Sequence, residues 1–168
     1  NLNSKPYIDL TLHVMTAFGL PTPENVDYKK FIFNKEPNHL TKDQPFNFTI
    51  ESDWSGAAFL LVAGAVAGDI VVKGLDVFST QADKAILSAL MDCGCTISIQ
   101  EKQIDIAPPA IGLPGLKAFH FDATDCPDLF PPLVALAACC QGTTAIQGVS
   151  RLAHKESNRG LTLQEEFG

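Results

Sequence analysis

The apolar residues in the first part of the chain follow two different spacings. Residues 7–18 place an apolar side chain every three or four positions, and Gly19 follows where helices commonly end. The next stretch, 20–30, contains proline, asparagine and aspartate and predicts a loop. Short apolar segments at 31–33 and 46–50 predict two strands, separated by a polar segment with a proline. We therefore expect a helix followed by a pair of strands.

The remaining residues alternate between helical and strand-like patterns, and the mixture predicts an α/β fold. The apolar stretch at 54–67 is shorter than the roughly 20 residues of a membrane span, so it predicts a buried helix. In chain order, the pattern predicts helices and strands as follows: a helix at 55–67, a strand at 69–73, a helix at 82–93, strands at 96–100, 103–107 and 118–122, a helix at 129–140, a strand at 143–147, and a closing helix to Phe167.

Similar residues recur at an offset of 74 positions, which indicates an internal duplication. The matched pairs are Gly68 and Gly142, Gly74 and Gly148, Gly94 and Gly168, Ala63 and Ala137, and Val72 and Ile146. A period of this length exceeds that of common solenoid repeats and suits a duplicated α/β subdomain. Because the last unit is incomplete, we expect the chain to be part of a longer protein.

Composition and charge narrow the class of function. The chain has 168 residues, of which 46% are hydrophobic and 18% charged, as in folded soluble proteins. Its formal net charge of -7 disfavours nonspecific binding to nucleic acid or to anionic membranes. The N-terminal residues resemble no export signal. We expect a cytoplasmic protein with neither nucleic acid nor membrane as a partner.

The five cysteines predict free thiols rather than a disulfide framework. Their number is odd and they are dispersed over apolar segments, as in proteins of a reducing compartment. Cys93 and Cys95 have C-x-C spacing, but no histidine or second cysteine pair stands at a zinc-site distance. We therefore interpret the cysteines as buried free thiols and expect no metal site.

Three segments, read together, resemble a known family. They are SKPYIDLTLHVMTAFG at 4–19, SDWSGAAFLLVAGAVAGDIVVKGL at 52–75, and DCPDLFPPLVALAACCQGTTAIQGVSRLAHKESNR at 125–159. In this order they are similar to the 5-enolpyruvylshikimate-3-phosphate synthase family, the enolpyruvyl transferases of the shikimate pathway. The run R-x-x-x-K-E-S-x-R after a P-D helix start is the most specific part.

The resemblance implies a two-lobed fold in which each lobe contains three related α/β subdomains. Residues 1–50 would belong to the last subdomain of the first lobe. Residues 51–122 would form a complete subdomain of the second lobe, and residues 123–168 a truncated one.

The resemblance also implies an activity. The enolpyruvyl group of phosphoenolpyruvate would pass to the 5-hydroxyl of shikimate 3-phosphate, with release of phosphate and no metal or organic cofactor, in aromatic amino-acid biosynthesis. An acidic chain suits such anionic substrates poorly, so we expect the missing cations in the rest of the same enzyme. We expect the 168-residue chain alone to be inactive, because a site split between lobes needs both halves.

The segment Ser4-Lys5-Pro6 at a helix start has two interpretations. Proline is tolerated in the first turn, and a nearby serine can cap free backbone N–H groups. The same donors and the helix dipole also suit a phosphate. In the resembled family this serine contacts the phosphate of shikimate 3-phosphate, which makes Ser4 a substrate-binding candidate with Tyr7 as its companion.

Acidic residues at two other helix starts also have a structural and a functional interpretation. Asp128 follows Pro127, with Asp125 just before, and helix capping would explain either acid. In the resembled family the acid of the P-D dipeptide holds the attacking hydroxyl and can accept its proton, which assigns Asp128 as the catalytic base. Asp53 lies beside Ser55 at another helix start, and we expect it to cap that helix.

A charge cluster near the end of the chain would ordinarily be a solvated turn. If the turn is helical, Lys155 and Arg159 share a face and Glu156 lies beside them. In the resembled family the Lys and Arg bind the anionic substrates, and the Glu takes part in proton transfer at the methylene carbon of phosphoenolpyruvate. Lys155 and Glu156 are therefore catalytic candidates, and Lys155, Arg159 and Arg151 are substrate-binding candidates. Arg151 stands where some members have Asn.

Two other functions compete with this one. The sister family that transfers enolpyruvate to UDP-N-acetylglucosamine shares the fold and the helix-start Asp, but the K-E-S-x-R run and S-K-P-Y favour the shikimate branch. A noncatalytic α/β binding module of the same fold would not need Ser4, Asp128, Lys155, Glu156 and Arg159 together.

Overall fold

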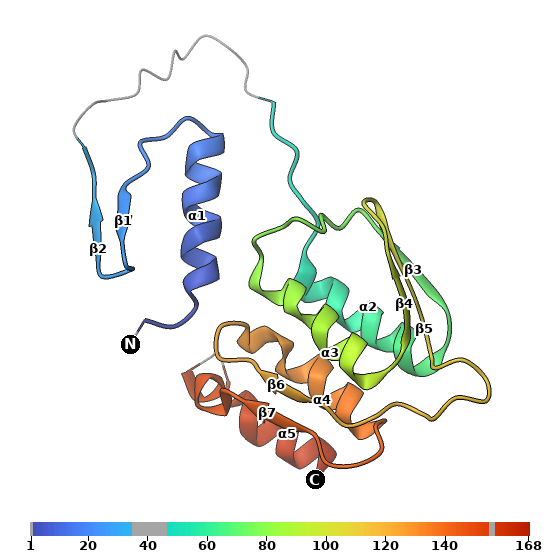
Figure 1. Ribbon diagram of the computed structural model, residues 1–168. Coiled ribbons are helices and arrows are strands. Elements are labelled where there is room, and N and C mark those ends of the chain that lie inside the picture. The colour runs from blue at the N-terminus through green and yellow to red at the C-terminus, as the bar shows by residue number, and fades with distance from the viewer. Residues whose placement is uncertain (1, 35–46, 155–156) are drawn as a thin grey trace.

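The first elements of the computed structural model are a helix and a two-stranded hairpin (Figure 1). The structure describes residues 2–34, 47–154 and 157–168. Helix α1 (Lys5–Ala17) precedes β1 (Glu24–Val26) and β2 (Lys30–Ile32), which pair antiparallel. Gly19, at φ 65°, follows the helix, as its sequence position predicts.

The hairpin corrects two predictions for this part of the chain. The expected loop contains β1, because Asp27 and Tyr28 both adopt positive φ angles, 52° and 56°. Such a pair closes a tight turn whose twist suits a hairpin, and the amide of Lys29 donates to the carbonyl of Val26 at 2.9 Å. The expected strand at 46–50 is not formed by its described residues, and residue 46 lies outside the described part of the chain.

The central part of the chain forms a three-stranded antiparallel sheet covered by helices. Strand β5 pairs with both β3 and β4, so the order is β3-β5-β4. Helix α2 lies against β5 at Gly64, where a side chain would collide with Ile106. The elements are α2 (Trp54–Ala67), β3 (Ile70–Lys73), the 3-10 turn η1 (Ala82–Ala85), α3 (Ile86–Cys93), β4 (Thr96–Ile99) and β5 (Gln103–Ala107).

The last part of the chain pairs two strands in parallel and ends in two helical segments. Strands β6 (His120–Asp122) and β7 (Ala145–Gln147) are joined by the turn η2 (Pro127–Leu129) and helix α4 (Phe130–Ala138). The turn η3 (Val149–His154) and helix α5 (Arg159–Phe167) follow.

The predicted closing helix to Phe167 is confirmed as α5, which begins only at Arg159. Ser157 and Asn158 are not helical, and the Asn158 side chain accepts from the amide of Leu161 at 3.3 Å, which starts a new helix.

The order helix, strand, 3-10 turn, helix occurs twice, in agreement with the recurrence in the sequence. It runs through α2, β3, η1 and α3, and again through α4, β7, η3 and α5. The mixed helices and sheets confirm the α/β fold class. The division into lobes at residue 50 stays a prediction.

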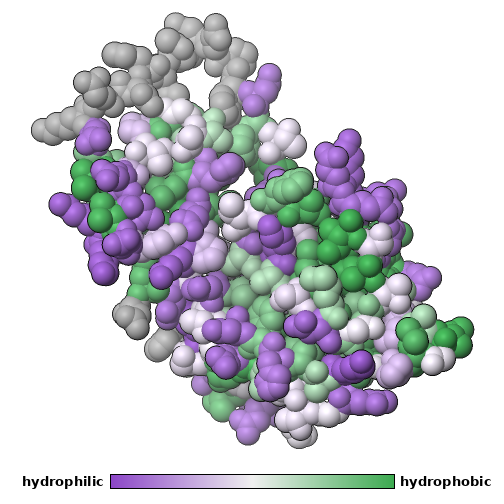
Figure 2. Space-filling view, viewed as in Figure 1, coloured by the Kyte–Doolittle hydropathy of each residue, from purple (hydrophilic) through white to green (hydrophobic). Residues whose placement is uncertain are grey.

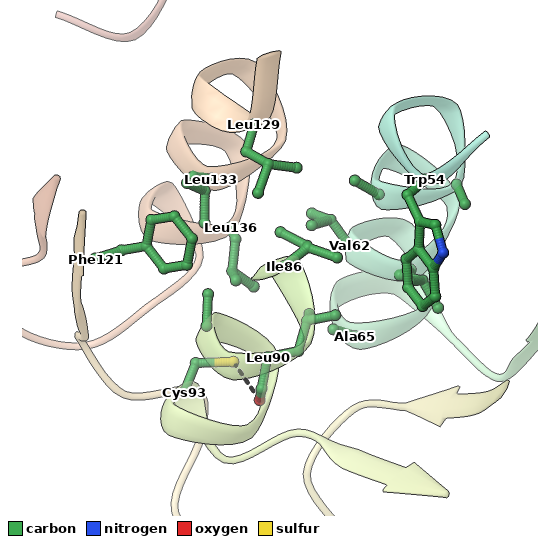
Figure 3. Packing of buried hydrophobic residues seen from close by; sticks show 14 of the residues in the cluster. Trp54, Val62, Ala65, Ile86, Leu90, Cys93, Phe121, Leu129, Leu133 and Leu136 are labelled. Carbon is green, nitrogen blue, oxygen red and sulfur yellow. Dashed lines mark hydrogen bonds between the residues drawn. The ribbon is translucent and has the colours of Figure 1, made fainter. Parts of the chain in front are cut away.

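The hydrophobic core lies where α2, α3 and α4 meet (Figure 3). Fully burying one such side chain contributes about 1.5–3 kcal/mol. Trp54 is wholly buried, and its indole N–H donates to the carbonyl of Asp76 at 3.1 Å. The prediction that α2 is a buried helix holds for one face only, because Phe59 and Leu60 are about half exposed. The large side chains buried between the helices include Trp54, Leu61, Ile86, Leu90, Leu129, Leu133 and Leu136.

Apolar side chains are exposed on the surface formed by residues 47–154 and 157–168 (Figure 2). Ile111 and Leu113, in the loop between β5 and β6, are strongly exposed. Within the described residues, no helix is both long and apolar enough to span a membrane.

The cysteines are free thiols, as the sequence predicts, but they are not all buried. Cys93 and Cys126 are buried, whereas Cys139 is exposed because it follows the end of α4. Among the described residues, no group of three or more His, Cys, Asp or Glu side chains could hold a metal ion.

Candidate active site

Ser4 is held by two segments that lie far from it in the sequence. Its amide donates to Oδ1 of Asp125 at 2.6 Å, and its hydroxyl oxygen accepts from Nη2 of Arg151 at 2.6 Å. The first turn of α1 therefore lies beside the loop that leads to α4 (Figure 1). The side chain of Ser4 makes no capping bond to α1, so helix capping does not explain this residue.

The backbone of Ser4 is left-handed, with φ 61° and ψ 37°. Residues other than glycine rarely adopt this conformation, and it persists where the surroundings hold it in place. Here the carboxylate of Asp125 and the guanidinium of Arg151 do so. The capping interpretation of Asp125 is also wrong, because η2 has no side-chain cap and Asp125 binds the Ser4 amide instead.

Arg151 has donors left over after it binds Ser4. It lies half-buried in η3, directly after Gly148 and the end of β7. Its Nε is buried and has no hydrogen-bond partner among the described residues. Buried polar groups are nearly always paired, so this N–H is an exception among the described residues.

Asp128 pairs with a cation. Its Oδ1 accepts from Nη1 of Arg159 at 2.8 Å, and both side chains are about one-third exposed. Asp128 lies in the first turn of η2, where no side chain caps the backbone. Helix capping is thus not what this carboxylate does in the structure, and it remains reachable from solvent.

Lys155 and Glu156 lie outside the described residues. The helical turn that would place Lys155 and Arg159 on one face is interrupted, because Ser157 and Asn158 precede the start of α5. The roles expected for Lys155, Glu156 and Arg159 stay predictions.

Tyr7 is bonded to an acid that the sequence did not single out. The hydroxyl of Tyr7, half-buried in α1, donates to Oδ2 of Asp83 at 3.4 Å. Burial raises the pKa of Tyr7, and the negative charges of Asp83 and Asp128 raise this pKa further. Tyr7 therefore keeps its proton and remains a hydrogen-bond donor.

Asp83 is a buried carboxyl group between α1 and α2. Burial raises its pKa, and the negative charges of Asp128 and Asp53 act in the same direction, while hydrogen bonds from Ser55 and Tyr7 oppose the rise. The sequence pattern around Asp83 predicts only a helix and gives no sign of these contacts. Asp83 stands out in the structure because acids are rarely buried so completely.

Asp53 caps α2, as the sequence predicts. Its carboxylate accepts from the amides of Ser55 at 3.1 Å and Gly56 at 2.9 Å. These bonds fix the first turn of α2, from which the hydroxyl of Ser55 reaches Asp83.

The structure thus combines an α/β fold with a candidate site in which hydroxyl, carboxylate and guanidinium groups from distant segments meet. The model of the family EPSP synthase (3-phosphoshikimate 1-carboxyvinyltransferase) matches residues 1–168. The chain belongs to this family, which confirms the family expected from its motifs.

Curated relatives agree with the family model. The chain is 37% identical over 166 residues to the 3-phosphoshikimate 1-carboxyvinyltransferase of Clostridium kluyveri, covering 99% of this chain and 37% of that protein. It is 34% identical over 166 residues to the protein of the same name from Clostridium novyi, covering 99% of this chain and 36% of that protein. The chain thus spans little more than one third of the length of these relatives.

A solved structure supports the fold. The EPSP synthase of Acinetobacter baumannii superposes with a TM-score of 0.67 at 24% sequence identity, over 92% of this chain and 35% of that one.

Proposed function

We propose that the full-length protein containing these residues transfers the enolpyruvyl group of phosphoenolpyruvate to the 5-hydroxyl of shikimate 3-phosphate and releases phosphate. Its substrates would be these two anions, in the cytoplasm, as a step of aromatic amino-acid biosynthesis. The observation that carries the proposal is the meeting of Ser4 with Arg151, together with that of Asp128 with Arg159, in a member of this family.

Ser4 and Arg151 supply the donors for a phosphate. The Ser4 hydroxyl and the guanidinium group of Arg151 can turn toward the oxygens of one dianion. Tyr7 keeps its proton and contributes a hydroxyl group from the same turn of the helix. This arrangement supports the assignment of the phosphate of shikimate 3-phosphate to the end of α1.

Asp128 would accept the proton of the attacking hydroxyl. A general base must be ionised and within hydrogen-bond reach of the proton it removes. The guanidinium of Arg159 stabilises the carboxylate form of Asp128, and anionic substrate would compete for the same guanidinium. Lys155 would bind the anionic substrates as well, and Glu156 would move the proton at the methylene carbon of phosphoenolpyruvate.

The site would be completed by the rest of the protein. We propose that residues 1–50 belong to one lobe and residues 51–168 to the other, with the substrates between them. Closure of two lobes excludes water and brings the reacting groups together, which makes the 168-residue chain alone insufficient.

Phosphate release tests the proposal. Purified full-length protein is given phosphoenolpyruvate with shikimate 3-phosphate, and in parallel with UDP-N-acetylglucosamine. Release only with shikimate 3-phosphate supports the proposal. Release only with UDP-N-acetylglucosamine would contradict it and indicate the activity of the sister family instead. The 168-residue chain serves as the control and is expected to release none.

A further inference from the structure

Asp83 is the most deeply buried acid of the described chain, and it touches two helices. It lies in η1 and is 2% exposed. Its Oδ2 accepts from the hydroxyl of Ser55, in the first turn of α2, and from the hydroxyl of Tyr7, in the first turn of α1. Its Oδ1 is buried and has no hydrogen-bond partner in the part of the chain that the structure describes.

Polar contacts hold the first turn of helix α1 against the residues around Asp83. None of its side chains is buried, so no hydrophobic contact comparable to those of α2 or α4 holds it. Its recorded polar contacts with the body of the protein lie at its first turn, where Ser4 meets Asp125 and Arg151 and where Tyr7 meets Asp83. Directional hydrogen bonds therefore decide how this end of the helix is placed.

We infer that Asp83 is a positioning residue, which through the hydroxyl of Tyr7 holds the first turn of α1 in the orientation where Ser4 and Tyr7 meet shikimate 3-phosphate. The inference rests on the proposed function. Asp83 acts through Tyr7 and does not itself contact the substrate, because its carboxylate is enclosed between Ser55 and Tyr7.

The hydrogen-bond partners described for the Asp83 side chain are both hydroxyl groups. Burial and the negative charges of Asp128 and Asp53 disfavour the carboxylate form of Asp83, whereas the hydrogen bonds from Ser55 and Tyr7 favour it. The hydrogen bond from the Tyr7 hydroxyl to Asp83 fixes the orientation of the Tyr7 side chain. Loss of Asp83 would leave a half-buried phenol free to turn, and a small displacement in a positioned site lowers affinity markedly.

Steady-state kinetics of the full-length protein test the inference with Asp83→Ala, Asp83→Asn and Tyr7→Phe. The KM for shikimate 3-phosphate should rise about tenfold in Asp83→Ala and in Tyr7→Phe, with little change in the KM for phosphoenolpyruvate. The double variant should be no worse than the worse single variant, since both changes remove the same hydrogen bond between Tyr7 and Asp83. Asp83→Asn should recover most of the affinity, because its amide oxygen accepts the same bonds.

Two controls separate this role from general stability. Ser79→Ala removes another buried polar group just before η1, one that accepts only from the amide of Gln81, and should leave both KM values unchanged. Amide hydrogen exchange in α1 should be faster by a similar factor in Asp83→Ala and Tyr7→Phe, whether or not substrate is present.

The possible results are distinct. A KM for shikimate 3-phosphate within twofold of wild type in Asp83→Ala, or multiplying effects of the Asp83 and Tyr7 changes, would overturn the inference and leave the proposed function intact. If the wild-type protein releases no phosphate from these substrates, the proposed function fails. The exchange rates in α1 then decide whether Asp83 holds this helix.

Discussion

The guanidinium of Arg151 donates to the hydroxyl oxygen of Ser4 at 2.6 Å, although 147 positions separate the two residues. The contact joins the start of α1 to η3, near the opposite end of the chain. Because Ser4 also has a left-handed backbone that Asp125 helps to hold, the hydroxyl is fixed before any ligand arrives. Such preorganisation reduces the entropy lost on binding.

Ser4→Ala and Arg151→Met should each weaken binding of shikimate 3-phosphate to the full-length protein by about tenfold. The two effects should be less than additive, because the residues act as a pair. Isothermal titration calorimetry measures the change, with Ser88→Ala, an exposed helical serine, as the matched control. Unchanged affinity in both variants would remove Ser4 and Arg151 from the phosphate site.

Asp128→Asn should lower kcat by roughly two to four powers of ten, because the amide keeps the shape but cannot take a proton. The melting temperature should change little, since a partly exposed ion pair such as that with Arg159 contributes only about 0–1 kcal/mol. Steady-state kinetics and a thermal melt check both expectations. Asp92→Asn, at an exposed acid on α3, is the matched control. Near-normal turnover in Asp128→Asn would eliminate the catalytic role.

Asp83 should make the stability of the protein depend on pH in a defined direction. Burial raises its pKa in the folded state above the ordinary 3.8, so the folded protein binds the proton more tightly than the unfolded chain. The stabilisation from the protonated form is fully present below the unfolded pKa and is lost as the pH rises through the folded pKa. Asp83→Asn cannot ionise, so its stability relative to wild type should increase as the pH rises above the ordinary pKa of 3.8.

Urea unfolding of wild type and Asp83→Asn across this range measures the effect. A constant difference between the two proteins at every pH would contradict the raised pKa. Asp92→Asn, at an exposed acid of α3, again serves as the control substitution.

Gly148→Ala should destabilise the protein by about 3 kcal/mol. Gly148 has φ +95°, and an added Cβ would lie 2.7 Å from the amide nitrogen of Thr124 and 2.9 Å from its Cα, atoms that cannot move without the backbone. Gly94 has φ +83° with open space around it, so Gly94→Ala should cost only about 1 kcal/mol. Equal unfolding free energies for the two variants in urea would show that the backbone at Gly148 and Thr124 can move apart to accommodate the added Cβ.

Local signals in the sequence predict much of the fold. Glycines at 19 and 94 end their helices with positive φ, and Asp53 caps α2, because each of these features depends on a few neighbouring residues. The hairpin turn escaped prediction since Tyr28, unlike glycine or asparagine, gives no signal of positive φ. The exposure of Cys139 likewise depends on what covers the end of α4, which a local pattern does not contain.

The candidate site was predictable only as far as the motifs of the family reach. Those motifs indicated Ser4, Asp128 and Arg159 but not what each of them contacts. Asp125 and Asp83 became candidates only when the fold placed them against residues of α1. Contacts between segments more than 70 positions apart depend on the packing of whole elements, and one sequence carries no direct record of them.

The burial of Trp54 gives the protein an intrinsic optical probe. The chain has one tryptophan and two tyrosines, and both tyrosines, Tyr7 and Tyr28, lie in the segment of α1 and the hairpin. Selective excitation of the indole therefore reports on the packing of α2. Excitation of the phenols with detection of indole emission reports on how near α1 stays to that core. Folding of the two parts can thus be followed separately, in a protein that carries no added label.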